Sequence, residues 1–293
     1  MPHPAVLLAG SRLARIGPAL LGAFSFACAD VLSKMVLRDG ADPLTTATLR
    51  GALGVLLMLP WLRLGRPPAP LEARARWIAR GLGALFAGNI FLLFNAFAVV
   101  EVPIAILTYF VYPLLTGLAA AATGLERLTW RGAAAALIAF LGLGVMLGAN
   151  PTGLAAIGIA AALAAACCRV VMLLITRGML GGADPILITW HSLVASTVVL
   201  AAASLAMLDW QAPQTLRGWA SLCGLSIAVT GGMLGVFAST VRIGPFRTAL
   251  FMNLEPLLAT IGSALLLTEV ITLLQALGGA VMIAALVLFQ LRK

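Results

Sequence analysis

The chain has few charged residues for its size. Asp, Glu, Lys and Arg make up 10% of the 293 residues, while hydrophobic residues make up 62%. Soluble domains carry roughly one-quarter charged residues because their surface faces water. The shortage of charge therefore excludes a soluble globular protein. Since one membrane crossing needs about 20 apolar residues, about ten crossings would use most of the chain and leave no room for a separate soluble domain.

Histidine and cysteine are also scarce, and this excludes several kinds of enzyme and metal protein. The two histidines are His3 and His191, and the sequence contains neither HExxH nor GxSxG. An intramembrane hydrolase or metalloprotease would need such groups. The cysteines lie in apolar stretches without metal-ligand spacing and are expected to be small buried side chains: Cys28, Cys167, Cys168 and Cys223. We expect no catalytic residue, metal site, cofactor or disulfide.

The formal net charge of +9 reflects membrane topology. The basic residues lie in short connections instead of one stripe or patch, so the sequence predicts no nucleic-acid partner. Lys and Arg are held on the cytoplasmic side of membranes. With the N-terminus inside, the outer connections hold little more than Arg38 and Arg217. The inner segments hold Arg12, Arg15, Arg63, Arg66, Arg74, Arg76, Arg127, Arg131, Arg177, Arg242, Arg292 and Lys293. Both termini are therefore predicted to be cytoplasmic.

Long apolar runs predict an all-α integral membrane fold with ten transmembrane helices. A run from Gly132 to Arg169 is split at residues 150–153, and its second part is expected to continue to about Ile175 as the sixth helix. The other helices are expected near 16–37, 44–62, 81–100, 102–125, 185–208, 218–241, 245–268 and 270–291.

The two halves of the chain repeat one another. The segment 40–44 (GADPL) recurs as 182–186 (GADPI), and each Asp-Pro pair is expected to cap and open a helix. The motifs PLL and ExxT also recur at an offset of 143 residues: Pro113 and Pro256 begin the first, and Glu126 and Glu269 begin the second. We expect a first repeat at 1–150 and a second at 151–293, within one membrane domain.

Each repeat holds five helices, an odd number, so the second repeat must cross the membrane in the opposite sense. Inverted repeats are typical of secondary transporters, which place the substrate site at the interface between the halves and expose it to each side in turn. The sequence has no Walker motif, so the energy would come from a solute or proton gradient or from exchange.

Together these features resemble the drug/metabolite transporter superfamily, in particular its ten-helix EamA-type members. The resemblance rests on Pro113 and Pro256, each followed 13 residues later by Glu, and on Lys34, Pro43 and Arg50. It covers about residues 16–290. It implies a multi-pass protein of a bacterial-type inner membrane that exports small metabolites, with YddG-like exporters of aromatic or other neutral amino acids as the specific expectation.

The fourth and ninth helices carry the strongest candidate site. Pro113 and Pro256 lie near their midpoints and are expected to act as hinges, because a proline removes a backbone donor. Freed backbone groups within a membrane are tolerated beside other helices or a wetted cavity. The polar neighbours of the prolines are candidate substrate-binding residues: Tyr109, Tyr112, Asn253 and Glu255. An ionisable group such as Glu255 at mid-membrane is usually functional; alternatively, the kinks only improve packing.

Three charged residues near the outer half of the membrane are further candidates. Asp30 and Lys34 lie one helical turn apart, and Arg50 lies two turns into the second helix. One of them would contact the carboxylate or ammonium group of an amino acid. Alternatively, Asp30 and Lys34 neutralise each other, and Arg50 anchors to lipid headgroups.

The remaining candidates are polar or aromatic residues in other helices. Asn89 and Asn95 would either bind substrate or bridge helices. His191 beside Trp190 would either couple protons or pack as a hydrogen-bonded side chain. Arg169 is expected close to the end of the sixth helix, where its long side chain reaches the interface.

The sequence thus predicts a carrier whose partners are a small-molecule substrate and the lipid bilayer; no oligomeric state follows from it. The alternatives are an efflux carrier for other small solutes or drugs, a channel, and an intramembrane enzyme. A carrier is distinguished by saturable flux without ATP, a channel by conductance that does not saturate, and an enzyme by bound zinc or a covalent serine adduct.

Overall fold

A computed structural model describes residues 4–64, 70–148, 155–207 and 210–291, which form helices and short connections without a strand. The first half contains α1 (Pro4–Arg38), α2 (Pro43–Leu64), α3 (Ala73–Phe97), α4 (Val102–Tyr109), α5 (Tyr112–Ala122) and α6 (Trp130–Leu147). The second half contains α7 (Ala156–Met179), α8 (Pro185–Met207), α9 (Leu216–Ile243), α10 (Pro245–Met252), α11 (Leu254–Leu267) and α12 (Leu273–Leu291).

These twelve helices make ten membrane spans. The pairs α4 with α5 and α10 with α11 each form one span, Val102–Ala122 and Pro245–Leu267. Within the described ranges, nine spans are long and apolar enough to cross a membrane, and the shorter apolar helix Leu273–Phe289 supplies the tenth. The prediction of an all-α membrane protein with ten transmembrane helices is confirmed.

Several predicted helix ends differ from the observed ends. The third helix begins at Ala73 instead of residue 81, because Arg74, Arg76 and Arg80 belong to its first turns. The sixth predicted helix corresponds to α7, which continues to Met179, beyond the expected end near residue 175. Long basic side chains extend toward water from the end of a span, so a helix continues past its uncharged core. The predicted repeat boundary at 150/151 lies outside the described residues.

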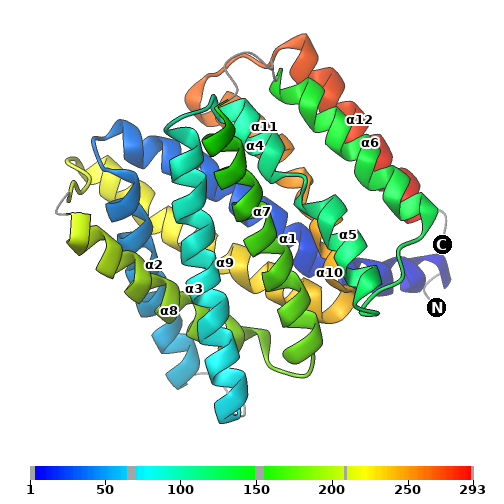
Figure 1. Cartoon of the computed structure of the whole chain (residues 1–293), viewed down its shortest axis with the longest axis horizontal. Coiled ribbons are helices and arrows are strands. Elements are labelled where there is room, and N and C mark those ends of the chain that lie inside the picture. The colour runs from blue at the N-terminus through cyan, green and yellow to red at the C-terminus, as the bar shows by residue number, and fades with distance from the viewer. Residues whose placement is uncertain (1–3, 65–69, 149–154, 208–209, 292–293) are drawn as a thin grey trace.

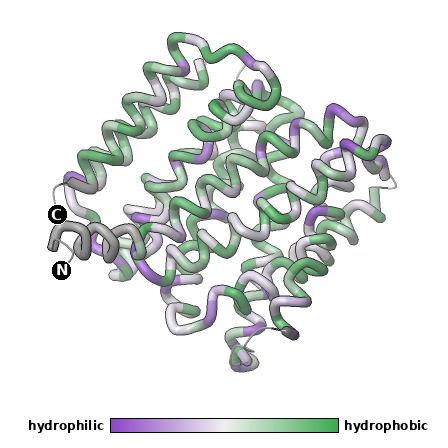
Figure 2. The backbone as a smooth tube through the Cα atoms, turned by 180° about the vertical axis from the view of Figure 1, so that it is seen from behind, coloured by the Kyte–Doolittle hydropathy of each residue, from purple (hydrophilic) through white to green (hydrophobic). Residues whose placement is uncertain are grey.

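The surface of the helix bundle is apolar. Figure 2 shows hydrophobic residues along most of the length of the helices, with hydrophilic residues mainly near helix ends and connections. Large exposed apolar side chains include Leu56, Leu141, Ile157, Val198, Ile227 and Leu265. A soluble protein rarely exposes so much continuous apolar surface. The chain is therefore a multi-pass membrane protein whose outer surface contacts lipid.

Aspartate caps open equivalent helices in the two halves. Asp42 Oδ1 accepts hydrogen bonds of 2.8 Å from the N–H groups of Leu44 and Thr45 at the start of α2. Asp184 Oδ1 accepts one of 2.8 Å from the N–H of Ile186 at the start of α8. The capping role predicted from the repeated Asp-Pro pairs is confirmed, because each carboxylate satisfies helix-terminal donors that have no intrahelical partner.

The two repeats pack against each other through equivalent helices. α1 of the first repeat packs on α9 of the second, and α7 of the second packs on α3 of the first. Figure 1 shows α2 beside α8 at one end of the bundle and α6 beside α12 at the other, and both pairs are in contact. Since the second repeat starts after five spans, it crosses the membrane in the opposite sense. This is the predicted inverted-repeat architecture.

Glycines allow the closest of these contacts. A Cβ atom on Gly235 of α9 would lie 2.6 Å from the backbone nitrogen of Gly22 in α1. A Cβ on Gly278 of α12 would collide with the backbone of Gly142 and Met146 in α6. Small residues let membrane helices approach through their backbones, so these positions fix how the repeats meet.

The connections lie on two faces of the membrane. We call the face on which the chain begins the N-terminal face; it carries the connections 123–129 and 180–184 and the junction at Gly244. The distal face carries the connections 39–42, 98–101, 210–215 and 268–272. The start of α1 and the end of α12 lie on the same side of the bundle in Figure 1, as an even number of spans requires.

The four cysteines are unpaired. Cys28 and Cys168 are half-buried, whereas Cys167 and Cys223 are exposed on the bundle surface. The expectation of small buried side chains is therefore wrong for the latter two. In lipid an exposed apolar side chain carries no penalty, so position in an apolar run did not determine burial.

Candidate functional site

The fourth and ninth spans are broken at their centres. α4 ends at Tyr109 and α5 begins at Tyr112, while α10 ends at Met252 and α11 begins at Leu254. Pro113 and Pro256 follow these breaks within the first turn of the second helix, where a proline fits because no intrahelical donor is needed. The predicted mid-span irregularities are confirmed. Such broken helices are tolerated in membranes where they line a protein interior or a wetted space.

Arg169 lies at the centre of the membrane, and its predicted position near a helix end is wrong. It is the fourteenth residue of α7, which continues ten residues further to Met179. The side chain is only 5% exposed. Its guanidinium carbon lies 5.4 Å from the ring centroid of Phe26 and 5.9 Å from that of Tyr112. The guanidinium therefore lies near two aromatic rings in the bundle interior and does not reach the interface.

The position of Arg169 could have been inferred from the start of the next helix. The connection before α8 is fixed by Gly181-Gly182 and by the Asp184-Pro185 cap, so α7 has to continue almost to residue 180. Arg177 and Gly178 suggested an earlier end. Counting back from the cap of the next helix would have placed Arg169 near the middle of its span.

Two carboxylates and a second guanidinium share this region. Glu255 in the first turn of α11 interacts electrostatically with Asp30 of α1 and Arg169 of α7. Asp30 also interacts with Arg50 of α2 and with Lys34. We call Asp30, Arg50, Arg169 and Glu255 the central charge cluster. Four helices from both repeats contribute to it.

The charged groups of the cluster lie well within their spans. A charge facing lipid at this depth is costly, and these groups interact electrostatically with one another across several helices. Ionisable groups at this depth mark the cluster as the candidate functional site.

Buried polar atoms beside the cluster have no hydrogen-bond partner within the described residues. These atoms are Arg169 Nε and Asn253 Oδ1. Asn253 is only 1% exposed. A buried polar group without a partner costs about 1–3 kcal/mol. Two such atoms close to the span breaks are well suited to hydrogen-bonding a polar ligand.

Aromatic rings form one side of the same region. The ring centroids of Tyr109, Phe110 and Tyr112 lie 5.3–5.6 Å apart. Tyr109 interacts electrostatically with Arg169 and Glu255 and lies within hydrogen-bonding distance of Asn89. The break between α4 and α5 therefore brings aromatic surface close to charged groups, and substrate binding by Tyr109, Tyr112 and Glu255 stays a prediction.

The other predicted site residues have identifiable partners. Lys34 Nζ lies 3.1 Å from Glu269 Oε2 and donates to Ser263 Oγ at 3.2 Å, so it pairs with the second repeat. Asn89 Nδ2 donates to the carbonyl of Ala165 at 2.7 Å and joins α3 to α7. Exposed Asn95 donates to the carbonyl of Phe91 in its own helix. The bond of Asn89 agrees with the alternative that this residue bridges two helices. In both Asn89 and Asn95 the bond uses one N–H of the side-chain amide.

Trp190 and His191 lie away from the central charge cluster. The charged groups that act on His191 are Arg76 and Arg80, near the start of α3. The neighbouring Ser192 donates to the carbonyl of Ala79 at 2.8 Å, which fixes α8 to the same part of α3. Both residues therefore lie toward the N-terminal face. Their predicted contact with substrate would occur while the substrate moves between that face and the central charge cluster.

Ionic contacts join the repeats on the distal face. Glu269 pairs with Lys34 at 3.1 Å and with Arg38 at 3.2 Å. Nearby, Asp39 accepts bonds of 2.9 Å from the N–H groups of Gln214 and Thr215. We call the contacts of Glu269 the distal latch, since they tie α1 to the connection after α11.

A similar contact joins the repeats on the N-terminal face. Glu126 Oε1 lies 3.4 Å from Arg247 Nε, and Glu126 Oε2 accepts a 3.0 Å bond from the N–H of Phe246 at the start of α10. Burial raises the pKa of Glu126, and these bonds with nearby Arg247 and Arg177 oppose that rise. We call the contacts of Glu126 the N-terminal latch. The repeated ExxT motif therefore supplies an equivalent latch glutamate on each face.

The comparison with known families decides the identity of this architecture. The description "EamA-like transporter family" matches residues 16–148 and again residues 156–291. The chain belongs to the EamA-like transporter family. The two matches cover the five spans of each repeat and confirm the resemblance to the drug/metabolite transporter superfamily. As members of this family are transporters, a small-molecule substrate and a lipid environment follow for this EamA-like transporter.

A solved structure agrees with the fold of this EamA-like transporter. The structure, described as "Crystal structure of protein", superposes with a TM-score of 0.75 at 21% sequence identity, over 94% of this chain and 98% of the other. At this identity the likeness concerns the fold alone. No protein of curated function matches the sequence.

Proposed function

We propose that this EamA-like transporter is a secondary carrier that exports neutral amino acids through the central charge cluster. The observation that carries the proposal is the balance of charge there. Asp30 and Glu255 supply two carboxylates, and Arg50 and Arg169 supply two guanidinium groups. A zwitterionic amino acid brings one charge of each sign, so it can pair with the cluster without leaving an unpaired charge at mid-membrane.

The substrate carboxylate would bind Arg169. A guanidinium presents a planar set of donors that matches a carboxylate with two parallel hydrogen bonds. Nε of Arg169 is without a partner in the described part of the chain. The substrate ammonium would then face Glu255 and Asp30, which are the nearest acceptors of positive charge.

The apolar side chain of the substrate would contact the aromatic rings beside the span break. Tyr109 and Tyr112 lie next to Arg169, and the ring of Phe26 also lies near its guanidinium. Large aromatic surfaces favour an apolar or aromatic substrate side chain over a small polar one. This supports aromatic and other neutral amino acids as the substrate class.

Alternating access would expose this site to each side of the membrane in turn. Latches join the two repeats on both faces, at Glu269 and at Glu126. Opening one while the other stays closed would move one repeat against the other, with the breaks before Pro113 and Pro256 as hinges. The driving energy would come from the substrate gradient, a proton gradient or exchange.

We infer that the N-terminal face is cytoplasmic in a bacterial-type inner membrane. This rests on the concentration of Arg in the segments of that face. A fluorescent-protein fusion at the C-terminus should fluoresce, and an alkaline phosphatase fusion there should be inactive. Active phosphatase with a dark fluorescent protein would contradict the orientation.

Flux into proteoliposomes tests the substrate class. Uptake of labelled phenylalanine should saturate, need no ATP, and be reduced by excess leucine or tryptophan but not by glutamate or lysine. Glu255→Gln should reduce this flux at least tenfold, because the ammonium loses a full charge partner. Glu72→Gln, at an exposed position without a side-chain cap bond, should transport normally.

The same assay distinguishes the alternatives. Saturable flux of a lipophilic cation such as tetraphenylphosphonium, unaffected by any amino acid, would favour an efflux carrier for other small solutes or drugs. Normal phenylalanine flux in Glu255→Gln would remove Glu255 from the site. Absence of flux for every amino acid would reject the proposed substrate class.

A further inference from the structure

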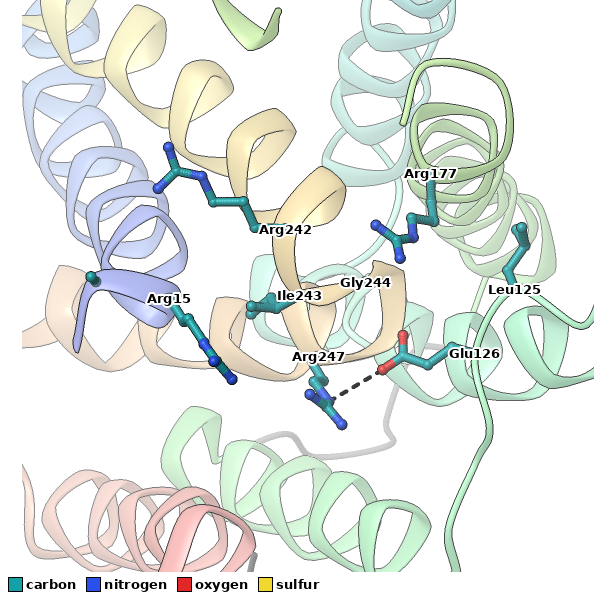
Figure 3. Close-up of a pocket in the computed structure, with 9 residues that line it drawn as sticks. Arg15, Leu125, Glu126, Arg177, Arg242, Ile243, Gly244 and Arg247 are labelled. Carbon is teal, nitrogen blue, oxygen red and sulfur yellow. Dashed lines mark ion pairs between the residues drawn. The ribbon is translucent and has the colours of Figure 1, made fainter. Parts of the chain in front are cut away.

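A charged pocket lies on the N-terminal face, apart from the central charge cluster. Its volume is about 610 Å³, and it lies where α1, α7, α9 and α10 approach the connection after α5. Figure 3 shows side chains from these elements arranged around one space. Its ionisable lining residues are Arg15, Glu126, Arg177, Arg242 and Arg247.

The pocket has a large excess of positive charge. Four guanidinium groups and one carboxylate line it, and that carboxylate is already engaged by Arg247 and by the N–H of Phe246. Arg177 donates to the carbonyl of Val241 at the end of α9. Arg15 and Arg242 form neither an ion pair nor a hydrogen bond within the described ranges. Two guanidinium groups are thus available to an anion.

Membrane orientation alone does not require this arrangement. The positive-inside bias depends on how many basic residues lie near one face, and Arg63, Arg74, Arg127 and Arg131 supply it without lining the pocket. Four like charges around one space repel each other. Their convergence from four helices of both repeats is explained if a multivalent anion binds between them.

We propose that this pocket binds a phosphate group, supplied by the headgroup of an anionic phospholipid in the leaflet of the N-terminal face or by a soluble phosphate ester. A phosphate group offers several acceptor oxygens, which suits guanidinium groups that approach from different helices. Arg15 lines the pocket together with Glu126 of the connection after α5 and with Gly244 at the junction of α9 and α10, and so lies at the level of the headgroups on that face. The bound phosphate would connect α1 to α9 and stabilise the closed N-terminal face.

Lipid binding to the full-length protein tests the site. Native mass spectrometry in detergent would compare phosphatidylglycerol with phosphatidylcholine of identical acyl chains. We expect at least tenfold tighter binding of phosphatidylglycerol. The double variant Arg15→Gln, Arg242→Gln should weaken that binding about thirtyfold, since each basic residue near an anionic headgroup contributes about fivefold.

A matched variant controls for loss of charge on the same face. Arg74→Gln with Arg131→Gln removes two exposed arginines outside the pocket and should leave phosphatidylglycerol binding unchanged. Arg15→Lys keeps the charge and should retain most of the binding. An equal loss in the control pair, or unchanged binding in the Arg15→Gln, Arg242→Gln variant, would overturn the site.

Soluble ligands separate the two sources of phosphate. Glycerol 3-phosphate that binds the wild type as tightly as phosphatidylglycerol, and is lost in the pocket variant, assigns the site to a soluble phosphate ester. Tight binding of the lipid alone assigns it to the headgroup. Binding of neither overturns the proposal. These measurements do not involve transport, so their result is independent of the amino-acid assignment.

Discussion

At the scale of single residues, Arg169 is the most informative position in the molecule. It is buried within its span near Phe26 and Tyr112, and within the described ranges it forms no ion pair with a carboxylate closer than 4 Å. Burial of a charge inside a membrane protein is unfavourable and usually marks a functional residue. The proposed substrate carboxylate would complete the interactions of this arginine.

Substitution of Arg169 by lysine should test this role. Arg169→Lys keeps the positive charge but loses the planar donors, so we expect KM for phenylalanine export to rise about tenfold to a hundredfold, as for one or two charged hydrogen bonds. The control is Arg80→Lys, at an exposed arginine stacked on Trp77. An unchanged KM in Arg169→Lys would show that the substrate carboxylate binds elsewhere.

Asp39 and Asp42 provide a pH prediction on the distal face. Hydrogen bonds from Thr215 and Gln214 lower the pKa of Asp39. Burial opposes ionisation of Asp42, but backbone donors of Thr45, Gln211 and Leu44 outweigh it and lower its pKa as well. A lowered pKa contributes stability above the unfolded value of about 4, which is lost as pH falls through the folded pKa.

The unfolding temperature should therefore fall as pH decreases from 5 to 3. Asp42→Asn should lower it at pH 7 and flatten this acid dependence. The control, Asp184→Asn, affects a cap with a single bond to Ile186 and no bond to the other repeat, so its effect should be smaller. An acid profile of Asp42→Asn equal to that of the wild type would contradict the prediction.

At the scale of helices, the breaks in the fourth and ninth spans determine what the centre of the protein contains. An intact helix would satisfy its backbone groups internally throughout the span. The break at Phe110 and Val111 instead interrupts the helix beside Tyr109 and Tyr112, whose ring centroids lie 5.3 Å apart. The equivalent break at Asn253 leaves Glu255 in the first turn of α11.

The pairing of α6 with α12 depends on backbone contact at one glycine. Gly278→Ala would place a methyl group against the backbone of Gly142 and Met146. We expect it to destabilise the protein by about 1–3 kcal/mol, as for overpacking, seen as a lower unfolding temperature in detergent. Gly88→Ala in α3 meets no atom within 4 Å and should be neutral or slightly stabilising. An equal change in the unfolding temperature of Gly278→Ala and Gly88→Ala would contradict the close contact at Gly278.

At the scale of the whole molecule, the inverted repeats produce the same interactions on both faces. The latch glutamates Glu126 and Glu269 follow equivalent spans and pair with basic residues of the opposite repeat. Thr129 and Thr272 then accept a bond from a backbone N–H at the start of α6 and α12. One repeated motif thus provides a cap and a latch, and inversion places the latches on opposite sides of the membrane.

Crosslinking the latches tests alternating access. In a protein whose native cysteines are replaced, Lys34→Cys with Glu269→Cys, joined by a short bismaleimide, should abolish flux because the distal latch cannot open. Glu126→Cys with Arg247→Cys should do the same on the N-terminal face. Lys34→Cys alone, treated with the reagent, should remain active. Full flux with either pair crosslinked would show that the latches need not open.

Much of the fold could be predicted from the sequence because its determinants are local. The number of spans follows from apolar runs, the starts of α2 and α8 from Asp-Pro caps, and the two breaks from Pro113 and Pro256. The inversion follows from counting five spans per repeat. Helix ends were less accurate, as for α3 and α7, because arginines lie inside helices as well as in connections.

The sequence alone determined that this protein crosses the membrane ten times as two inverted halves, since burial of apolar segments in lipid and local capping act along the chain. The tertiary structure alone decided which polar groups meet. Asp30, Arg50, Arg169 and Glu255 come from four helices, and the rotation of each helix is not encoded in its hydrophobic pattern when both lipid and protein interior are apolar. Packing between helices sets that rotation and so creates the central charge cluster.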